Sequence, residues 1–312
     1  MIATRALPLL VLSLLWLAAG CGGADERKAA GPIDLSELSG RIAFSSGTDD
    51  VYAVEADGSG LTRLTSGRAW DFDPSWSPDG SRIAFRSERD GNPEIYVMRD
   101  DGSGQRNLSR SDAADWGPEW APVGETIAFN SDRSESGQMQ LFLDGADGER
   151  ARRVESRYVE YPTWSPDGSR IAFMSPTPYG TENYEIYVMN VDGTGLRRLT
   201  SSPGSDGWPA WSPDGKTIAF SSVRDDCSYS DAKECKDSGD IGPFHTLYAM
   251  DADGTHERRL SDRFGQFAAW SPDGEYIVFA PGLNVIRADG SGLVQLRVKG
   301  LPSEPEMPDW IG

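Results

Sequence analysis

Residues 76–98 decide the fold: Trp76-Ser77-Pro78-Asp79-Gly80 is followed by Arg82-Ile83-Ala84-Phe85 and then by Glu94-Ile95-Tyr96-Val97-Met98. Pro-Asp-Gly is a tight turn, because Pro presets φ, Asp hydrogen-bonds to its own backbone and Gly accepts positive φ. The two segments that follow are short and rich in β-branched and aromatic residues, which is typical of strands. The stretch therefore predicts a strand that ends at Trp76, a tight turn and two further strands.

The same order recurs along the chain. It begins again at Trp164, Trp211 and Trp270, and a weaker copy begins at Trp120, where Ala-Pro-Val-Gly replaces Ser-Pro-Asp-Gly. An Asp-Gly pair, which favours a hairpin, separates the third segment from a fourth. These pairs lie at residues 57–58, 101–102, 147–148, 192–193, 253–254 and 289–290. Each repeat is therefore predicted to be a four-stranded antiparallel unit, with its strands termed A to D in chain order.

The strand count predicts how the units assemble. The B strands are expected to begin near Ile42, Ile83, Ile127, Ile171, Ile218 and Ile277. The A strands are expected to end at Trp76, Trp120, Trp164, Trp211, Trp270 and Trp310. The first B strand has no A strand before it, and the last A strand has no B strand after it. We therefore expect an all-β, six-bladed propeller in which the strand of Trp310 completes the N-terminal blade, because closure removes exposed sheet edges.

These repeats resemble the TolB-type propeller repeat, which is also called WD40-like or PD40. The resemblance rests on Trp-Ser-Pro-Asp-Gly, Ile-Ala-Phe and Ile-Tyr-Val-Met, and it extends from about residue 40 to residue 312. It implies six blades, as in the TolB propeller, but no N-terminal α/β domain of the TolB kind is expected before the first strand. The motif specifies a fold that carries many activities.

The N-terminal residues predict export and a lipid anchor. Arg5 precedes an apolar stretch over 7–19, and residues 17–21 read Leu-Ala-Ala-Gly-Cys. This ending resembles the lipobox of bacterial lipoproteins, which implies cleavage before Cys21 and acylation of that residue; an ordinary secretory signal with an incidental Cys is the alternative. We expect a signal peptide over 1–20, a flexible tether over 21–38 and the propeller over 39–312. The lipid would be the protein's only attachment to a cell membrane, on its exported side.

Composition and motifs argue against catalysis and against nucleic acid. The net charge is −19, and an acidic surface repels phosphate. No Gly-x-Ser-x-Gly elbow or His-Glu-x-x-His motif occurs, and the two histidines, His245 and His256, are too few for a histidine-rich metal site. We therefore expect no catalytic residue, no metal and no cofactor.

The irregular segments are expected to carry a partner. In a propeller the D–A and B–C connections share one face, and here they hold aromatic residues interleaved with carboxylates, as binding surfaces often do. The candidate contact residues are Trp70, Asp71, Asp73, Asp115, Trp116, Tyr158, Glu160, Asp206, Trp208 and Phe267. The alternative is that many of the aromatic residues pack between blades near the channel. Cys227 and Cys235, in a B–C insertion on this face, are expected to form a disulfide.

The sequence leaves three functions open. The first is a monomeric, non-catalytic scaffold at the cell envelope that binds a protein or peptide partner. The second is a propeller that binds a small molecule or a cation in its central channel, with a possible sensory role. The third is a hydrolase or lyase. Polar side chains that converge in a deep channel pocket would favour the second, and a histidine hydrogen-bonded to a Ser or carboxylate there would favour the third.

Overall fold

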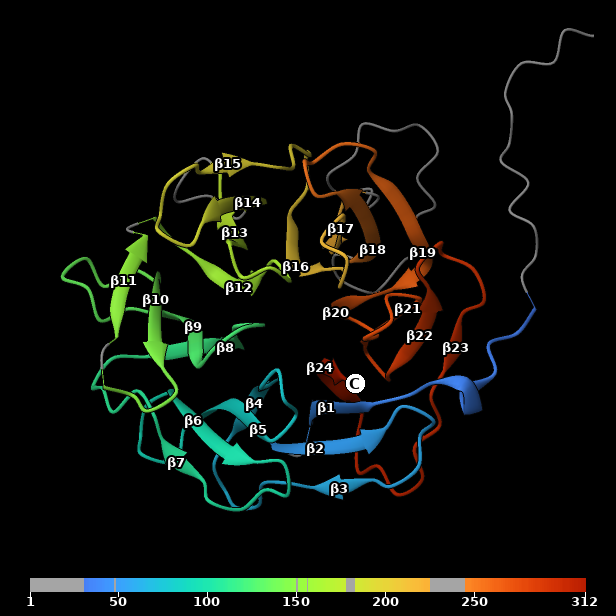
Figure 1. Ribbon diagram of the computed structural model, residues 1–312, viewed down its shortest axis with the longest axis horizontal. Coiled ribbons are helices and arrows are strands. Elements are labelled where there is room, and N and C mark those ends of the chain that lie inside the picture. Colours follow the sequence, from blue (N-terminus) through green and yellow to red (C-terminus); the bar gives the residue numbers. More distant parts are fainter. Residues whose placement is uncertain (1–30, 48, 150, 156, 178–182, 225–244) are drawn as a thin grey trace, which may run out of the picture.

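Six four-stranded antiparallel sheets are arranged as a ring around a central channel in the computed structural model (Figure 1). The structure describes residues 31–47, 49–149, 151–155, 157–177, 183–224 and 245–312. The helical content of these ranges is one 3-10 turn, η1 (Leu35–Glu37). No helix among them is long and apolar enough to cross a membrane.

Each blade is numbered here by its place in the ring, and its strands run from the channel outward. Blade 1 contains β24 (Pro305–Ile311), β1 (Arg41–Ser46), β2 (Asp50–Glu55) and β3 (Thr62–Arg63). Blade 2 contains β4 (Asp71–Trp76), β5 (Arg82–Ser87), β6 (Glu94–Arg99) and β7 (Arg106–Asn107). Blade 3 contains β8 (Asp115–Trp120), β9 (Thr126–Ser131), β10 (Gln140–Gly145) and β11 (Arg152–Glu155).

The remaining blades follow the same plan. Blade 4 contains β12 (Glu160–Trp164), β13 (Arg170–Pro176), β14 (Tyr184–Asn190) and β15 (Arg197–Arg198). Blade 5 contains β16 (Asp206–Trp211), β17 (Thr217–Ser222), β18 (Thr246–Asp251) and β19 (Arg258–Phe264). Blade 6 contains β20 (Gln266–Trp270), β21 (Tyr276–Ala280), β22 (Asn284–Arg287) and β23 (Val294–Gln295).

The predicted ring closure is confirmed. Strand β24 pairs antiparallel with β1, and Trp310 lies opposite Ile42 in the register. The C-terminal strand therefore supplies the innermost strand of the N-terminal blade, and Figure 1 shows the red and blue ends of the chain side by side there. All six blades have four strands as a result.

The core lies between neighbouring blades and repeats with them. The Phe of each Ile-Ala-Phe strand has no exposed surface, and these residues are Phe44, Phe85, Phe129, Phe173, Phe220 and Phe279. The Trp that ends each A strand is also buried. Each fully buried side chain of this size stabilises the fold by roughly 2–3 kcal/mol, so most of the stability is expected to come from the blade contacts.

The turns between the A and B strands form as their sequence predicted. Gly80 adopts φ +67°, and Asp79 accepts hydrogen bonds from the Ser77 hydroxyl at 2.6 Å and from the Ser81 amide at 3.0 Å. These hydrogen bonds, that from Ser77 first, lower the pKa of Asp79 to about 2. The carboxylate of this turn is therefore ionised at any physiological pH.

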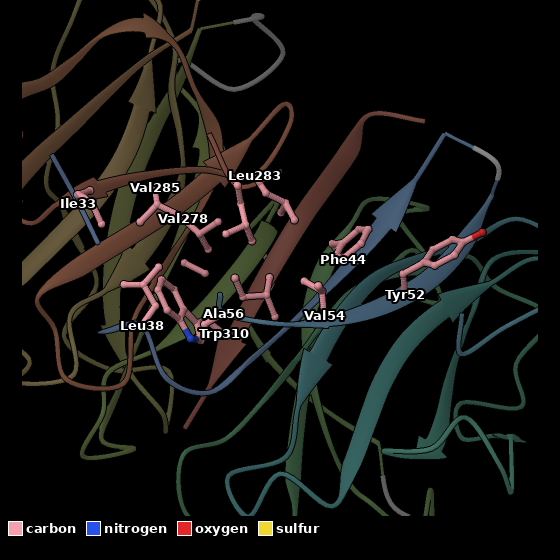
Figure 2. Packing of buried hydrophobic residues seen from close by; sticks show 13 residues of the cluster. Ile33, Leu38, Phe44, Tyr52, Val54, Ala56, Val278, Leu283, Val285 and Trp310 are labelled. Atoms are coloured by element: carbon pink, nitrogen blue, oxygen red, sulfur yellow. The ribbon is translucent and has the colours of Figure 1, made fainter. Parts of the chain in front are cut away.

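Residues 31–38 differ from the flexible tether that was expected there. Ile33 and Leu38 are buried in the cluster that joins blade 6 to blade 1, together with Trp310 (Figure 2). The Arg287 guanidinium also donates to the Gly31 carbonyl at 3.0 Å. The packing of the propeller therefore begins before residue 39, because Ile33 and Leu38 are buried against residues of blades 6 and 1.

Candidate functional site

The channel wall is built from one repeated distortion of the innermost strands. In every blade the pairing of this strand shifts register two to three residues before its Trp, which marks a β-bulge. The residue at the bulge has a left-handed backbone, with φ between +48° and +55°, in all six blades. These residues, termed the bulge tier, are Asp73, Gly117, Tyr161, Trp208, Phe267 and Met307. Such a backbone is costly for bulky residues.

Aromatic side chains dominate one half of the bulge tier. The rings of Tyr161 and Trp208 lie 6.1 Å apart, those of Trp208 and Phe267 5.0 Å, and those of Tyr161 and Phe267 6.0 Å. They come from blades 4, 5 and 6, whose innermost strands contact each other in that order. Three π faces are thus gathered on one side of the channel.

Acidic side chains occupy the other half. Asp73 belongs to blade 2, and two residues beyond the bulge tier the wall carries Glu119 in blade 3 and Asp309 in blade 1. The equivalent positions in the other blades hold Ser75, Thr163, Ala210 and Ala269. Blades 1 to 3 therefore present three carboxyl groups opposite the aromatic side chains of blades 4 to 6.

The carboxyl groups of Glu119 and Asp309 interact electrostatically. Burial raises the pKa of Glu119 well above its ordinary value, and the neighbouring Asp309 raises it further. Burial likewise raises the pKa of Asp309 to about 6. Asp309 still accepts the Trp76 amide hydrogen at 2.6 Å. Two carboxyl groups on the wall of one largely apolar cavity do not ionise together easily, so they are expected to share a proton near neutral pH.

These residues surround a cavity of about 410 Å³ that fills the channel from the bulge tier to the turns after the A strands. At its far end it is lined by Pro78, Pro122, Pro213 and Pro272 of those turns. Its lining includes no Lys, Arg or His among the described residues. The cavity is therefore acidic and aromatic, and it reaches the face opposite the irregular segments.

Three of the predicted contact residues each form a buried ion pair with an arginine, and the same arrangement recurs in three blades. Asp71, Asp115 and Asp206 each begin an innermost strand and are buried. Each accepts from an arginine, Arg89 at 3.0 Å, Arg133 at 2.7 Å and Arg224 at 2.6 Å. Each arginine also donates to the Ser that ends its B strand. These carboxylates hold the D–A segments in place, and they offer a partner almost no surface.

The other predicted residues divide between the surface and the channel. Trp70 is the most exposed aromatic residue among the described residues of the irregular face, with 52% of its surface accessible, and it meets Phe72 edge-on at 6.5 Å. Tyr158 and Glu160 are half-buried at the start of blade 4, and the Tyr158 hydroxyl donates to the Glu160 carboxylate. Trp208, Phe267 and Asp73 line the channel cavity.

Trp116 belongs to a cation–π stack that the sequence analysis did not predict. The guanidinium of Arg86 lies 4.2 Å from the centre of the Trp116 ring and 5.0 Å from that of Phe72. Its Nε atom is 3.5 Å from Asp73 Oδ2. Arg86 is 7% exposed, so it is buried beside Asp73, and it is not among the residues that line the cavity.

Cys21, Cys227 and Cys235 lie outside the described residues. Acylation of Cys21 and a disulfide between Cys227 and Cys235 stay predictions. No group of three or more metal-ligating residues occurs within the part of the chain that the structure describes.

Sequence reasoning missed the carboxyl pair, although a signal was present. Five of the six repeats share an x-Pro-x-Trp pattern, with Ala268 in place of Pro in the other, and the residue before Trp is small or neutral except at Glu119 and Asp309. Comparing that one column would have identified two acidic residues in the same tier of the channel. It would not have shown that they share a cavity without a basic neighbour.

Comparison with known proteins identifies the repeat. The family described as TolB beta propeller domain matches residues 41–115, 90–177 and 157–228, which together span more than half of the chain. A Protein TolB homolog of Chlorobium luteolum is 44% identical over 57 residues, and a Tol-Pal system protein TolB of Desulfosudis oleivorans is 41% identical over 56 residues. These matches cover 18% and 17% of this chain, and each spans only 13% of the relative's own length.

Solved structures share the architecture. The crystal structure of TolB from Acinetobacter baumannii superposes with a TM-score of 0.68 at 21% identity. The match covers 89% of this chain and 67% of that one. At this identity the likeness concerns the fold alone.

Proposed function

Because this chain belongs to the TolB beta propeller domain family, we propose that it is a non-catalytic scaffold which binds a protein or peptide partner at the cell envelope. The irregular face, formed by the D–A and B–C connections, is the proposed contact surface. A matched relative is named as a Tol-Pal system protein, which supports an envelope setting.

The observation that carries the proposal is Trp70. A half-exposed tryptophan on a rigid segment is the side chain most often found at the centre of a protein interface. The segment is rigid because the adjacent Asp71 is clasped by Arg89 through two hydrogen bonds of 3.0 Å. A preformed surface binds with a smaller loss of conformational entropy. Tyr158 and Glu160 would extend the contact, while Asp71, Asp115 and Asp206 would shape it from beneath.

Site-specific photocrosslinking tests the proposed surface in the producing cells. Benzoylphenylalanine at position 70 is expected to give a discrete adduct with another protein. The matched control is the same residue at position 123, because Val123 is an apolar side chain with 61% exposure in a turn on the opposite face. Adducts from position 123 alone, or from neither position, would contradict the proposed face.

We also propose that Cys21 carries the lipid anchor and that Cys227 and Cys235 are bridged. The Cys21→Ser variant is expected to leave the membrane fraction or to accumulate as uncleaved precursor, since several acyl chains are needed for firm anchoring. Mass spectrometry of the non-reduced, exported protein should show the acyl mass on residue 21 and one bridged peptide pair. Normal processing with full membrane retention of the variant would exclude the anchor, and free thiols at 227 and 235 would exclude the bridge.

A further inference from the structure

The channel cavity combines two kinds of wall that recognise the same chemical group. Tyr161, Trp208 and Phe267 bring three aromatic rings to one half, with centroids 5.0 to 6.1 Å apart. Glu119 and Asp309 bring two carboxyl groups to the other half. Aromatic faces attract cations, and carboxylates neutralise them. A divalent metal would gain nothing from the aromatic half, whereas an organic cation uses both.

Asp73 adds a third acidic group to the cavity wall. It lines the cavity and is 7% exposed. Its partners among the described residues are weak: Arg86 Nε lies 3.5 Å from Oδ2, the Gly117 amide faces the carboxyl group, and neither oxygen accepts a hydrogen bond of good geometry. A buried carboxylate with such weak partners is costly, and a cationic ligand with N–H or polarised C–H groups would relieve that cost.

We propose that this cavity is a binding site for an organic ammonium group, held between the aromatic half and the carboxyl pair Glu119 and Asp309. The volume of about 410 Å³ falls within the range of small-ligand pockets. The ammonium group comes either from a small free cation or from a lysine side chain of a bound peptide. The inference is independent of the proposed function, because the cavity opens at the face opposite the irregular segments.

Binding should depend on pH, because the cation replaces a proton. The titratable groups that face the cavity from the innermost strands are Asp73, Glu119, Tyr161 and Asp309. The charged groups around them are Arg86, beside Asp73, and three arginines stacked over the wall tryptophans, Arg41 on Trp76, Arg82 on Trp120 and Arg170 on Trp211. The titratable ring of His245 lies 4.8 Å from that of Trp208. Burial raises the pKa of Asp309 to about 6, so a cation must displace the proton below that pH. Affinity is therefore expected to fall about tenfold from pH 7 to pH 5.

Isothermal titration of the purified full chain tests the site with four probes. Choline supplies a quaternary ammonium, and 3,3-dimethylbutan-1-ol is its neutral analogue of the same shape. The acetyl-Gly-Lys-Gly-amide peptide supplies a lysine side chain, and calcium chloride supplies a metal ion. Choline or the peptide is expected to bind at least tenfold more tightly than the neutral alcohol, and the tighter of the two identifies the source of the cation.

Conservative variants locate the binding. Glu119→Gln and Asp309→Asn are each expected to weaken binding of the cation by about tenfold or more. Glu306→Gln is the matched control, since it removes an exposed carboxylate from the same strand as Asp309 but outside the cavity, and it should bind as the natural protein does. Thermal melting verifies that each variant is folded, and either acid variant alone is sufficient for the test.

Three results would overturn the proposal. One is equal binding of choline and its neutral analogue, which would make the cavity merely apolar. Another is calcium binding that Glu119→Gln and Asp309→Asn abolish, without binding of either ammonium probe, which would assign the acids to a metal. The third is binding of choline or the peptide that is the same in both acid variants as in Glu306→Gln, which would place the cation elsewhere.

Discussion

Removal of residues 305–312 is expected to abolish the cooperative fold. The deletion takes away β24 and with it Trp310, which is 6% exposed within the cluster that joins blades 6 and 1. It also removes the hydrogen bond from the Trp76 amide to Asp309 and leaves β1 as an open sheet edge. Loss of one buried Trp alone costs about 3–5 kcal/mol, against a total stability of about 5–15 kcal/mol for most domains.

Circular dichroism melting and size-exclusion chromatography measure this effect. The truncated protein should lose its sharp transition and form aggregates through the exposed edge of β1. A chain that lacks only Gly312 is the matched control and should melt like the full chain. A truncated chain that remains monomeric with an unchanged melting curve would mean that β24 does not close the ring.

The Asp309→Asn variant is expected to be more stable than the natural protein at alkaline pH. Burial raises the folded-state pKa of Asp309 from 3.8 to about 6. A carboxyl group with a raised pKa favours the folded state fully below its unfolded pKa, and this contribution is lost as pH rises through the folded pKa. Asn removes that loss while its side-chain oxygen can still accept the Trp76 amide hydrogen. The shift corresponds to about 1–3 kcal/mol at pH 8.

Urea unfolding at pH 4, 6 and 8 measures the difference. The two proteins should differ least at pH 4, close to the unfolded-state pKa of 3.8, should diverge between pH 4 and pH 6, where the carboxyl group is ionised only in the unfolded state, and should keep the full difference at pH 8. Glu306→Gln, in the same strand but exposed, should show no such divergence. An Asp309→Asn protein that is no more stable at pH 8 would show that Asp309 titrates normally and would also weaken the shared-proton description of the pair.

The fold could be predicted from the sequence because its determinants are local and repeated. Pro-Asp-Gly turns and the regular return of Trp give the number of blades, and the unmatched strands at the two ends give the closure. The packing of Ile33 and Leu38 was not predictable, because two apolar residues among Gly, Pro and charged residues carry no periodic signal. Their groove exists only once blades 6 and 1 are joined.

The candidate site could be predicted only in part. Trp70 and Tyr158 were placed correctly on D–A segments, but the sequence did not show that Asp71 and Asp115 would be taken up by arginines two residues beyond the B strands. The left-handed backbone of Tyr161 and Trp208 was unpredictable, because bulky residues rarely adopt it. Those bulges aim the rings into the channel, and their partners Glu119 and Asp309 come together only through closure.

Hydrogen exchange of the C-terminal strand tests the central claim most directly, since the complete blades and the channel cavity all depend on a ring closed by β24. Amides of residues 305–312 are compared in the native full chain with those of the equivalent strands over 206–211 and 266–270. The closed ring predicts similar protection in all three segments. Exchange of residues 305–312 at the rate of an unstructured peptide, with the other two segments protected, would contradict it.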